Sequence, residues 1–276
     1  MKKHLSSIIL VAVFLVGLCI LLYPAISDYV NSKNQSRAIA SYDSALANME
    51  AKDYSAFFDA ADAYNALLLE DYMTFYDPSR VEGYWETLDV TGTGIMGYID
   101  IDKIKVELPI YHGTSEAVLN VAVGHLEGSA LPTGGLGNHI VLSAHRGLPS
   151  AILFTDLDEL KIGDIFTITV LDRLLTYEVD QVLIVEPTEV DALLPVPKRD
   201  YCTLVTCTPY GINTHRLLVR GKRIENIKEK PIIFVPADMM QIDPIIVTPA
   251  IAAPILLVLL IILMVKYRKR KDDGES

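Results

Sequence analysis

Two apolar stretches, one near each end of the chain, limit what this sequence can fold into. The first runs from Leu5 to Tyr23 and the second from Ile245 to Val265, and neither contains a charged residue. Each is close to the roughly 20 apolar residues that a helix needs to cross a bilayer. Lys2 and Lys3 precede the first stretch, and a basic cluster over 266–271 follows the second. The positive-inside rule therefore predicts that both termini lie in the cytoplasm and that the segment between the stretches lies outside.

Each stretch has an alternative interpretation. The first could be a cleaved signal peptide, because Ala25 and Ser27 flank Ile26 in a small-x-small cleavage pattern. We favour a retained anchor, since the apolar run is longer than the roughly 7–15 residues of a signal-peptide core. The second could be a buried core helix. The basic tail argues against that, and a membrane helix tolerates Pro249 and Pro254.

The charge of the chain excludes some partners. The net charge is −11, and the segment between the stretches is more acidic still because the basic ends lie outside it. An acidic domain is a poor binder of nucleic acid. The sequence contains no Gly-rich phosphate loop and no closely spaced pair of metal ligands. We therefore predict neither a cofactor nor a bound metal.

Three cysteines are present, and they have different surroundings. Cys19 lies within the first apolar stretch and is interpreted as packing. Cys202 and Cys207 are five positions apart, so on one unbroken strand they face opposite sides and lie about 16 Å apart. That separation is too large for a disulfide. Cys207 is therefore predicted to be a free thiol.

Between the apolar stretches, the pattern changes from helix to strand. Residues 28–69 are rich in Ala, lack Gly and Pro, and carry apolar side chains at helical spacing. We predict two helices, with a break near Lys52 and Asp53 and with Ser55 as the cap of the second. Strands are predicted over 98–101, 106–110, 140–144, 166–171, 177–186, 201–207 and 216–224. Short strands joined by turn residues favour a single sandwich or barrel.

The strand predicted over 201–207 says most about function. Pro209 cannot donate to a sheet ladder, so the strand should stop just after Cys207. A turn at 211–213 leads to the next strand, which begins at Arg216. This hairpin sets a guanidinium close to a thiol, as in a nucleophile with an oxyanion-stabilising partner. An inert buried cysteine and a surface ion pair are the plainer alternatives.

Several separated motifs resemble one family. TLVTC at 203–207 resembles the TLxTC signature of sortases, and SAHRG at 143–147 resembles the sortase histidine segment. Arg216 falls where the arginine of that family follows its cysteine. GHLEG at 124–128 and LFTDL at 153–157 resemble class C sortases, the pilus-assembling branch.

The resemblance extends from about residue 77 to residue 224 and implies a fold and a set of roles. The fold is mainly β, a sortase-type closed β-barrel with helices before it. Cys207 would be the nucleophile of an acyl transfer, with His145 as its acid and base. Arg216 would stabilise the oxyanion, together with a backbone N–H or the Thr206 hydroxyl. His145 is preferred by its motif alone. The competing histidines are His112, His125, His139 and His215.

Asp77 and Pro78 resemble the start of the lid that lies over the active site in class C sortases. The family usually places an aromatic residue next, where this chain has Ser79. The aromatic residues that could replace it are Tyr76, Tyr84 and Trp85. By resemblance, we expect Asp77 to pair with Arg216. We also expect a looser lid, since burying an aromatic side chain contributes roughly 1.5–3 kcal/mol.

The resemblance and the two apolar stretches together predict the layout of the chain. It comprises an anchor or signal segment (1–27), a helical region with the lid (28–89), a sortase barrel (90–230), a linker (231–244), a transmembrane helix (245–265) and a basic cytoplasmic tail (266–276). The implied function is that of a class C sortase, which cleaves an LPXTG-like sorting signal between Thr and Gly and joins the product to a pilin lysine. The alternatives are a housekeeping sortase that modifies peptidoglycan and a non-catalytic membrane-tethered scaffold. The expected partners are pilin subunits and the cell membrane.

The predicted topology can be tested with protease added to intact protoplasts. Cleavage is expected between residues 28 and 243, because that segment lies outside, while the tail at 266–271 should stay protected by the membrane. Epitope tags at the two ends report which fragments survive. Digestion of the C-terminal tag in intact protoplasts would contradict the topology.

Overall fold

The computed structural model describes residues 2–49, 51–226, 257 and 261. Two helices come first, α1 (Lys2–Ala47) and α2 (Ala51–Glu70). The predicted pair of helices is confirmed, but the break lies earlier than expected. The amides of Asn48 and Met49 bond carbonyls three residues back and close the end of α1. Ser55 therefore lies inside α2 and does not cap it. The break follows Asn48, and asparagine is unfavourable in helix interiors because its side chain competes for backbone hydrogen bonds.

The first apolar stretch is helical, as predicted. In the part of the chain that is described, one helix is long and apolar enough to cross a membrane, over Leu10–Ala47, with a mean hydropathy of 2.5 in its most apolar window. Pro24 lies within α1 and removes one backbone hydrogen bond without ending the helix. The second predicted span, 245–265, lies outside the described residues apart from positions 257 and 261.

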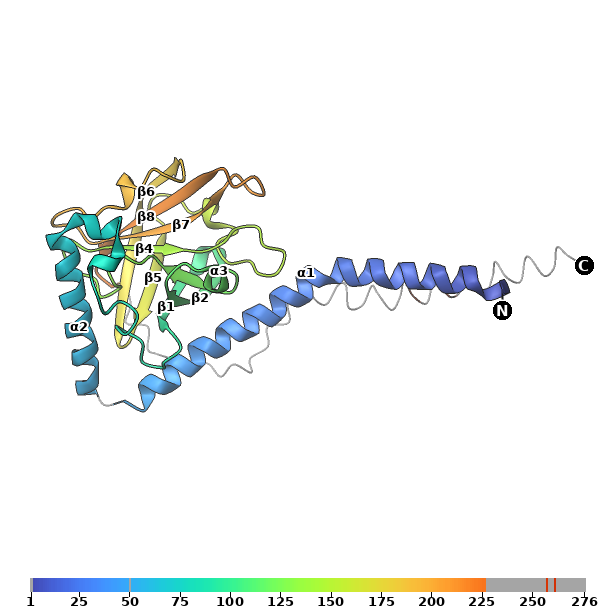
Figure 1. The fold of residues 1–276 in the computed structure, drawn as a ribbon, viewed down its shortest axis with the longest axis horizontal. Helices are drawn as coiled ribbons and strands as arrows, with labels where there is room; N and C mark the ends of the chain where they lie inside the picture. Colours follow the sequence, from blue (N-terminus) through green and yellow to red (C-terminus); the bar gives the residue numbers. More distant parts are fainter. Residues whose placement is uncertain (1, 50, 227–256, 258–260, 262–276) are drawn as a thin grey trace, which may run out of the picture. The chain divides into compact units, whose positions relative to one another are not determined.

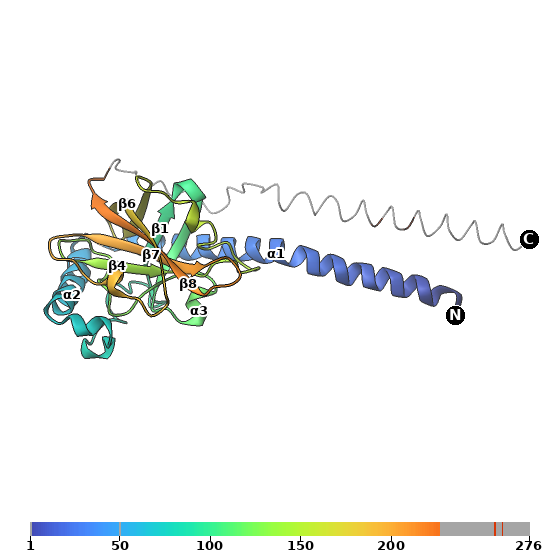
Figure 2. The same ribbon diagram turned by 90° about the horizontal axis from the view of Figure 1, so that it is seen from above.

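Residues 31–237 form a compact unit, and a β-barrel makes up most of its described part (Figures 1 and 2). The strands are β1 (Ile95–Ile101), β2 (Val106–His112), β3 (Val123–His125), β4 (His139–Ser143), β5 (Ile165–Val170), β6 (Arg173–Val185), β7 (Tyr201–Thr208) and β8 (His215–Ile224). They close in the order β1-β2-β3-β4-β7-β8-β6-β5. The predicted closed barrel is therefore confirmed, and each predicted strand is present within a few residues. Only β3 was missed, since three residues are too few to show a period.

Short helices connect the strands. They are α3 (Glu116–Leu119) and the 3₁₀ helices η1 (Tyr72–Phe75), η2 (Pro78–Arg80), η3 (Asp102–Ile104), η4 (Leu157–Glu159) and η5 (Asp191–Leu193). The first two of these 3₁₀ helices follow α2, and η2 contains Pro78 and Ser79 of the predicted lid.

Strand β7 has two different faces. Cys202, Leu204 and Thr206 are buried on the face that points into the barrel, where the first two join the main core. Val205, on the opposite face, belongs to a separate apolar cluster on the outside of the sheet. The alternation follows from the period of two in a strand. It assigns Cys207 to the outer face, together with Val205.

Two buried polar side chains fasten the helices to the barrel. Tyr42 of α1 donates to the carbonyl of Met96 at 3.0 Å and accepts from the N–H of Leu171 at 2.8 Å. Burial raises the pKa of Tyr42, so its hydroxyl stays protonated. Asn65 of α2 donates to the carbonyl of Leu131 at 3.2 Å and accepts from the Leu131 N–H at 2.7 Å. Removing either partner would leave a buried polar group unpaired, which costs about 1–3 kcal/mol.

Tyr84 connects the segment before the barrel to strand β3. Its hydroxyl lies 2.9 Å from Nδ1 of His125 and accepts from the N–H of Gly113 at 2.9 Å. Nε2 of His125 lies 2.8 Å from the carbonyl of Ala130, so this nitrogen carries the proton of the neutral ring. The ring of His125 is fully buried, and burial lowers its pKa to about 4. His125 is therefore a neutral structural residue.

His139 at the start of β4 is held in the same way. Its Nδ1 lies 2.9 Å from the carbonyl of Leu194, and its Nε2 lies 2.7 Å from the hydroxyl of Thr203. Burial is the main cause that lowers the pKa of His139 to about 4. The carbonyl can only accept, so Nδ1 donates and Nε2 accepts from the threonine.

These two histidines predict a specific loss of stability in acid. The unfolded chain binds a proton on each histidine below a pKa of about 6.5, whereas the folded chain does so only near 4. Stability is therefore complete above pH 6.5 and falls as the pH drops toward 4, by up to about 3 kcal/mol for each histidine. In urea titrations, His139→Asn should keep the bond to Leu194 and show a smaller loss between pH 7 and pH 4.5. Equal losses in the variant and the parent protein would contradict this.

Candidate active site

The hairpin of β7 and β8 brings Cys207 and Arg216 together. The two residues are directly opposite in the antiparallel register, so their side chains leave the same face of the sheet with Cβ atoms roughly 5 Å apart. The thiol of Cys207 is partly exposed, whereas Cys202 is buried. Burial raises the pKa of Cys202 well above its ordinary value, so that thiol is neutral and inert. The predicted pairing of Cys207 with Arg216 across the hairpin is present in the backbone register.

The guanidinium of Arg216 is turned toward its own hairpin. Its Nη1 donates to the carbonyl of Asn213 at 3.3 Å and to the carbonyl of His215 at 3.1 Å. These bonds use one nitrogen of the fork. The other N–H groups make no hydrogen bond to a described residue, so they are available to a ligand.

His145 reaches the same end of the barrel from strand β4. Strands β4 and β7 are parallel, with Ser143 opposite Val205, and the Ala144 N–H continues the ladder by donating to the Val205 carbonyl at 3.2 Å. Continuing this register by two residues sets His145 beside Cys207. The side chain of His145 is half-buried. Both the thiol and the imidazole therefore lie where β4 and β7 end.

The other histidines after residue 100 have different roles. His112, His125 and His139 are buried and hydrogen-bonded to backbone carbonyls. His215 lies opposite Thr208, and its Nε2 is 3.2 Å from a carboxylate oxygen of Glu186. The three buried rings cannot exchange protons with a substrate. Of the histidines after residue 100, His145 and His215 are the two that are not buried, and the choice of His145 stays a prediction from its motif.

Thr206 faces away from the thiol. Its buried hydroxyl donates to the carbonyl of Ala144 at 2.9 Å, and a hydroxyl has one hydrogen to donate. That hydrogen is therefore not free for a substrate oxyanion, which corrects the expectation for this side chain. The bond instead ties β7 to the segment that carries His145. A backbone N–H is the donor that remains as the partner of Arg216.

The segment predicted to be a lid has partners of its own. The Ser79 hydroxyl donates to Oδ1 of Asp77 at 2.6 Å, and Arg80 pairs with Asp71 at 2.6 Å. Pro78 lies against the turn after β3, since a Cβ on Gly128 would be 3.1 Å from its Cγ. Between residues 51 and 226, no ion pair joins Asp77 to Arg216. The expected pairing is therefore not formed in this structure.

Phe75, which the sequence did not indicate, is an aromatic residue that packs on the outer face of the sheet. It packs on a cluster formed by Val141, Leu193, Val205 and Leu218. Val205 and Cys207 share one strand face, two residues apart, so the cluster on which Phe75 packs lies on the face that carries the thiol. It precedes Asp77 by two positions, whereas the family pattern points to the position after Pro78.

The three aromatic residues considered for that role lie elsewhere. Tyr84 is buried, and Trp85 packs edge-on against it with ring centroids 5.1 Å apart. Tyr76 packs edge-on against Phe75 at 5.7 Å. Tyr76 therefore supports Phe75 on the side away from the cluster.

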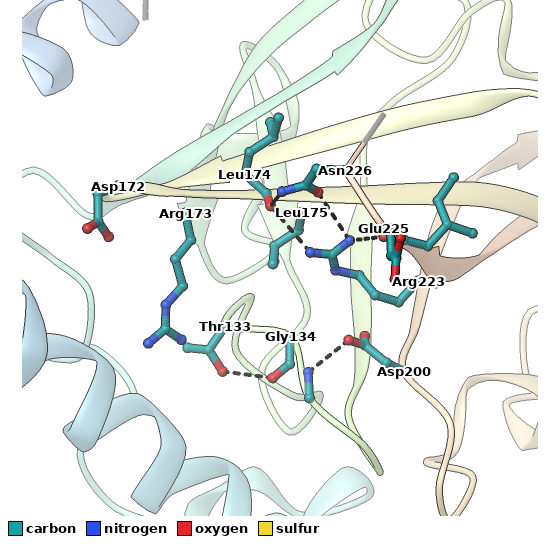
Figure 3. Close-up of a pocket in the computed structure, with 12 residues that line it drawn as sticks. Thr133, Gly134, Asp172, Arg173, Leu174, Leu175, Asp200, Arg223, Glu225 and Asn226 are labelled. Atoms are coloured by element: carbon teal, nitrogen blue, oxygen red, sulfur yellow. Dashed lines mark hydrogen bonds between the residues drawn. The ribbon is translucent and has the colours of Figure 1, made fainter. Parts of the chain in front are cut away.

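A cleft of about 730 Å³ opens at the end of the barrel opposite Cys207 (Figure 3). Asp200 lies in it, and its carboxylate accepts from the Gly135 N–H at 2.8 Å and from the Tyr177 hydroxyl at 3.0 Å. Burial raises the pKa of Asp200. Asp200 and Cys207 are seven positions apart, about 23 Å along the strand. The polar groups here serve the fold, and none of the lining residues is a cysteine, serine or histidine.

No cluster of three or more His, Cys, Asp or Glu residues suited to a metal is present among the described residues. At the thiol end, the register brings Cys207 and Arg216 together, and His145 follows the end of β4.

Comparisons with known proteins point to one family. The family model described as the Sortase domain matches residues 99–224. The crystal structure of sortase C1 from Streptococcus agalactiae is 47% identical, with a TM-score of 0.63, and the match covers 69% of this chain and 99% of that one. A structure described as pilus-related sortase C of Group B Streptococcus is 41% identical, with a TM-score of 0.60, and covers 66% of this chain and 95% of that one.

Curated relatives match over a shorter part. Sortase D of Bacillus subtilis (strain 168) is 31% identical over 131 residues, which are 46% of this chain and 63% of that protein. This chain spans less than two thirds of the length of the curated relatives it matches.

The two thiols of the barrel should differ sharply in reactivity. In a Cys19→Ala background, a charged methanethiosulfonate reagent should modify Cys207 and leave Cys202 unmodified, because only the former is exposed and the thiolate is the reactive form. Mass spectrometry of peptides locates the label. Cys207→Ala should take up no label until denaturant is added. Labelling of Cys202 in the folded protein would contradict the assignment.

Proposed function

Because this chain belongs to the sortase family and has class C sortases among its structural neighbours, we propose that it is a membrane-anchored cysteine transpeptidase that polymerises pilin subunits. The observation that carries the proposal is the pairing of a partly exposed Cys207 with Arg216 across one hairpin, at the end of β4 where His145 emerges. The substrates are an LPXTG-like sorting signal and the amine of a pilin lysine. Both termini lie in the cytoplasm and the barrel lies outside.

The first step forms a covalent bond to the cysteine. The Cys207 thiolate attacks the carbonyl carbon of the signal threonine, and the π electrons of the C=O bond move to oxygen. Free N–H groups of Arg216 lie on the same strand face and stabilise this oxyanion, together with a backbone N–H. A planar guanidinium suits this task because it presents donors in a fixed fork.

The second step breaks the Thr–Gly bond. The oxyanion re-forms the carbonyl, the C–N electron pair stays on nitrogen, and the imidazolium of His145 protonates the leaving amine. The glycine fragment departs and a thioester remains on Cys207. The lysine amine of a pilin then attacks the thioester carbon, neutral His145 takes its proton, and the thiolate leaves. The product is an isopeptide bond, and the enzyme returns to its starting state.

Two observations favour the pilus branch over a housekeeping sortase. Similarity to a pilus-related sortase C extends over most of that protein. In addition, two residues of the segment after α2 pack on the barrel, Phe75 on the apolar cluster of the face that carries Cys207 and Pro78 against Gly128. A lid of this kind would restrict access by small amines and favour a docked protein nucleophile.

The proposal predicts covalent ladders. The full chain in detergent, mixed with pilins that carry an LPXTG-like signal, should produce oligomers that survive boiling and reducing agent. Cys207→Ala should produce none. Arg216→Lys should be slower by about 10²–10³-fold, because an ammonium keeps the charge and loses the fork.

Cys202→Ala is the matched control, since that thiol faces the barrel interior, and it should form ladders at nearly the parent rate. Transfer to peptidoglycan amines without ladders would favour a housekeeping sortase. Absence of any thioester on Cys207 after addition of a signal peptide would favour a scaffold.

A further inference from the structure

Arg146 follows His145 and is buried, although it carries a charge. Its side chain is 9% exposed, and its Nη2 lies 2.5 Å from Oδ2 of Asp158. Its Nε–H is buried and has no hydrogen-bond partner in the part of the chain that is described. A buried unpaired donor costs free energy, and the side chain of Asp158 is 49% exposed, so the ion pair adds little stability. A contribution to stability is therefore a poor explanation for this arginine.

The arginine also contacts the hairpin that carries the cysteine. Its Cζ atom lies 5.8 Å from the centroid of the Tyr210 ring, within the range of a cation–π interaction. Tyr210 belongs to the turn between β7 and β8, three residues after Cys207. Nη1 of Arg216 bonds the carbonyl of Asn213 in the same turn. One guanidinium thus contacts the loop of the histidine and the turn between the cysteine and Arg216.

A close approach of the Gly147 backbone to the Tyr210 ring supports the same link. Gly147 has φ of 74°, and a Cβ built on it would lie 3.0 Å from Cε2 of Tyr210. Glycine is therefore needed both for the conformation and for the space. Two hydrogen bonds close the loop that carries His145 and Gly147. The Phe154 N–H donates to the His145 carbonyl at 3.1 Å, and the Gly147 N–H donates to Thr155 Oγ1 at 3.2 Å.

We propose that Arg146 is a positioning residue that sets the His145 imidazole against Cys207, by clamping the histidine loop to the β7–β8 turn through Asp158 and Tyr210. This inference rests on the proposed function. The clamp touches no substrate. It acts through the geometry of the proton transfer, so its loss should slow the chemical step and leave binding of the sorting signal almost unchanged.

Steady-state cleavage of an LPXTG-type peptide by the full chain provides the first test. Arg146→Met keeps the length of the side chain and removes the charge, and Tyr210→Leu removes the ring. Each should lower kcat about tenfold, equivalent to about 1.4 kcal/mol in the barrier, with KM changed less than about twofold. Tyr210→Phe keeps the ring face and should restore kcat. Glu178→Gln, which breaks an exposed ion pair with Lys222, is the matched control and should behave like the parent.

A second substrate separates positioning from a general loss of active protein. In an ester analogue with oxygen in place of the Thr–Gly nitrogen, the leaving alkoxide needs less protonation than the leaving amine. If the clamp acts through His145, the defect of Arg146→Met should be several-fold smaller on the ester than on the amide. Equal defects on both substrates would overturn the proposal. Arg146→Met combined with Tyr210→Leu should be no slower than the worse single variant, because both break one unit.

The clamp can also be tested without the proposed function. If the parent protein cleaves neither substrate, the transpeptidase proposal fails, and NMR of protein labelled at histidine then decides the clamp. The ring signals of His145 should move toward random-coil positions in Arg146→Met and in Tyr210→Leu, while those of buried His139 stay in place. Unchanged His145 signals in both variants would overturn the clamp.

Discussion

The hydrogen-bonded ladder on both sides of strand β7 is the constraint on which the site depends. On one side, β4 runs parallel and carries the chain to His145; on the other, β8 runs antiparallel and returns Arg216 opposite Cys207. A shift of one residue in either register would turn a side chain to the other face of the sheet. The proposed chemistry is therefore determined by backbone pairing before any side-chain contact is considered.

The interior of the barrel keeps that ladder in register. Leu204 and Cys202 are fully buried in the main core, and Thr206 is bonded to the carbonyl that precedes His145. A slip of β7 by one residue would expose these side chains and bury the Cys207 thiol. Neutral histidines such as His139 also hold the barrel together, because each ring nitrogen is hydrogen-bonded to another group of the fold. The polar residues of the core thus protect the register rather than take part in catalysis.

The outer face differs from the interior, since a segment from outside the barrel covers part of it. Phe75 lies on an apolar cluster that includes Val205, on the strand face that also carries Cys207. The carboxylate of Asp77, which could have anchored this segment to Arg216, is instead bonded to Ser79. Apolar contact therefore holds the segment, and the guanidinium remains available to an oxyanion. The proposed clamp around Arg146 joins the histidine loop to the β7–β8 turn.

The sequence by itself determined the elements that depend on neighbours in the chain. Period-two alternation and Pro209 were enough to place the β7–β8 hairpin and to pair Cys207 with Arg216, and the lack of charge in the first apolar stretch was enough to predict its helix. The same alternation already separated Thr206 from the face of the thiol, although its role was taken from the family. Geometry of this kind depends on the spacing of residues that are close together in the chain.

Tertiary structure decided the rest. The bond between Thr206 and Ala144 spans 62 positions, and no local pattern reveals which distant strand will lie parallel to β7. Strand β3 is too short to have a period, and Phe75 was recognisable only once α2 had carried it onto the outer face of the barrel. Arg146 could be linked to Tyr210 only after two loops met at the rim. These features arise from contacts between segments far apart in the chain, whose pairing is selected by packing of the whole barrel and not by the residues beside them.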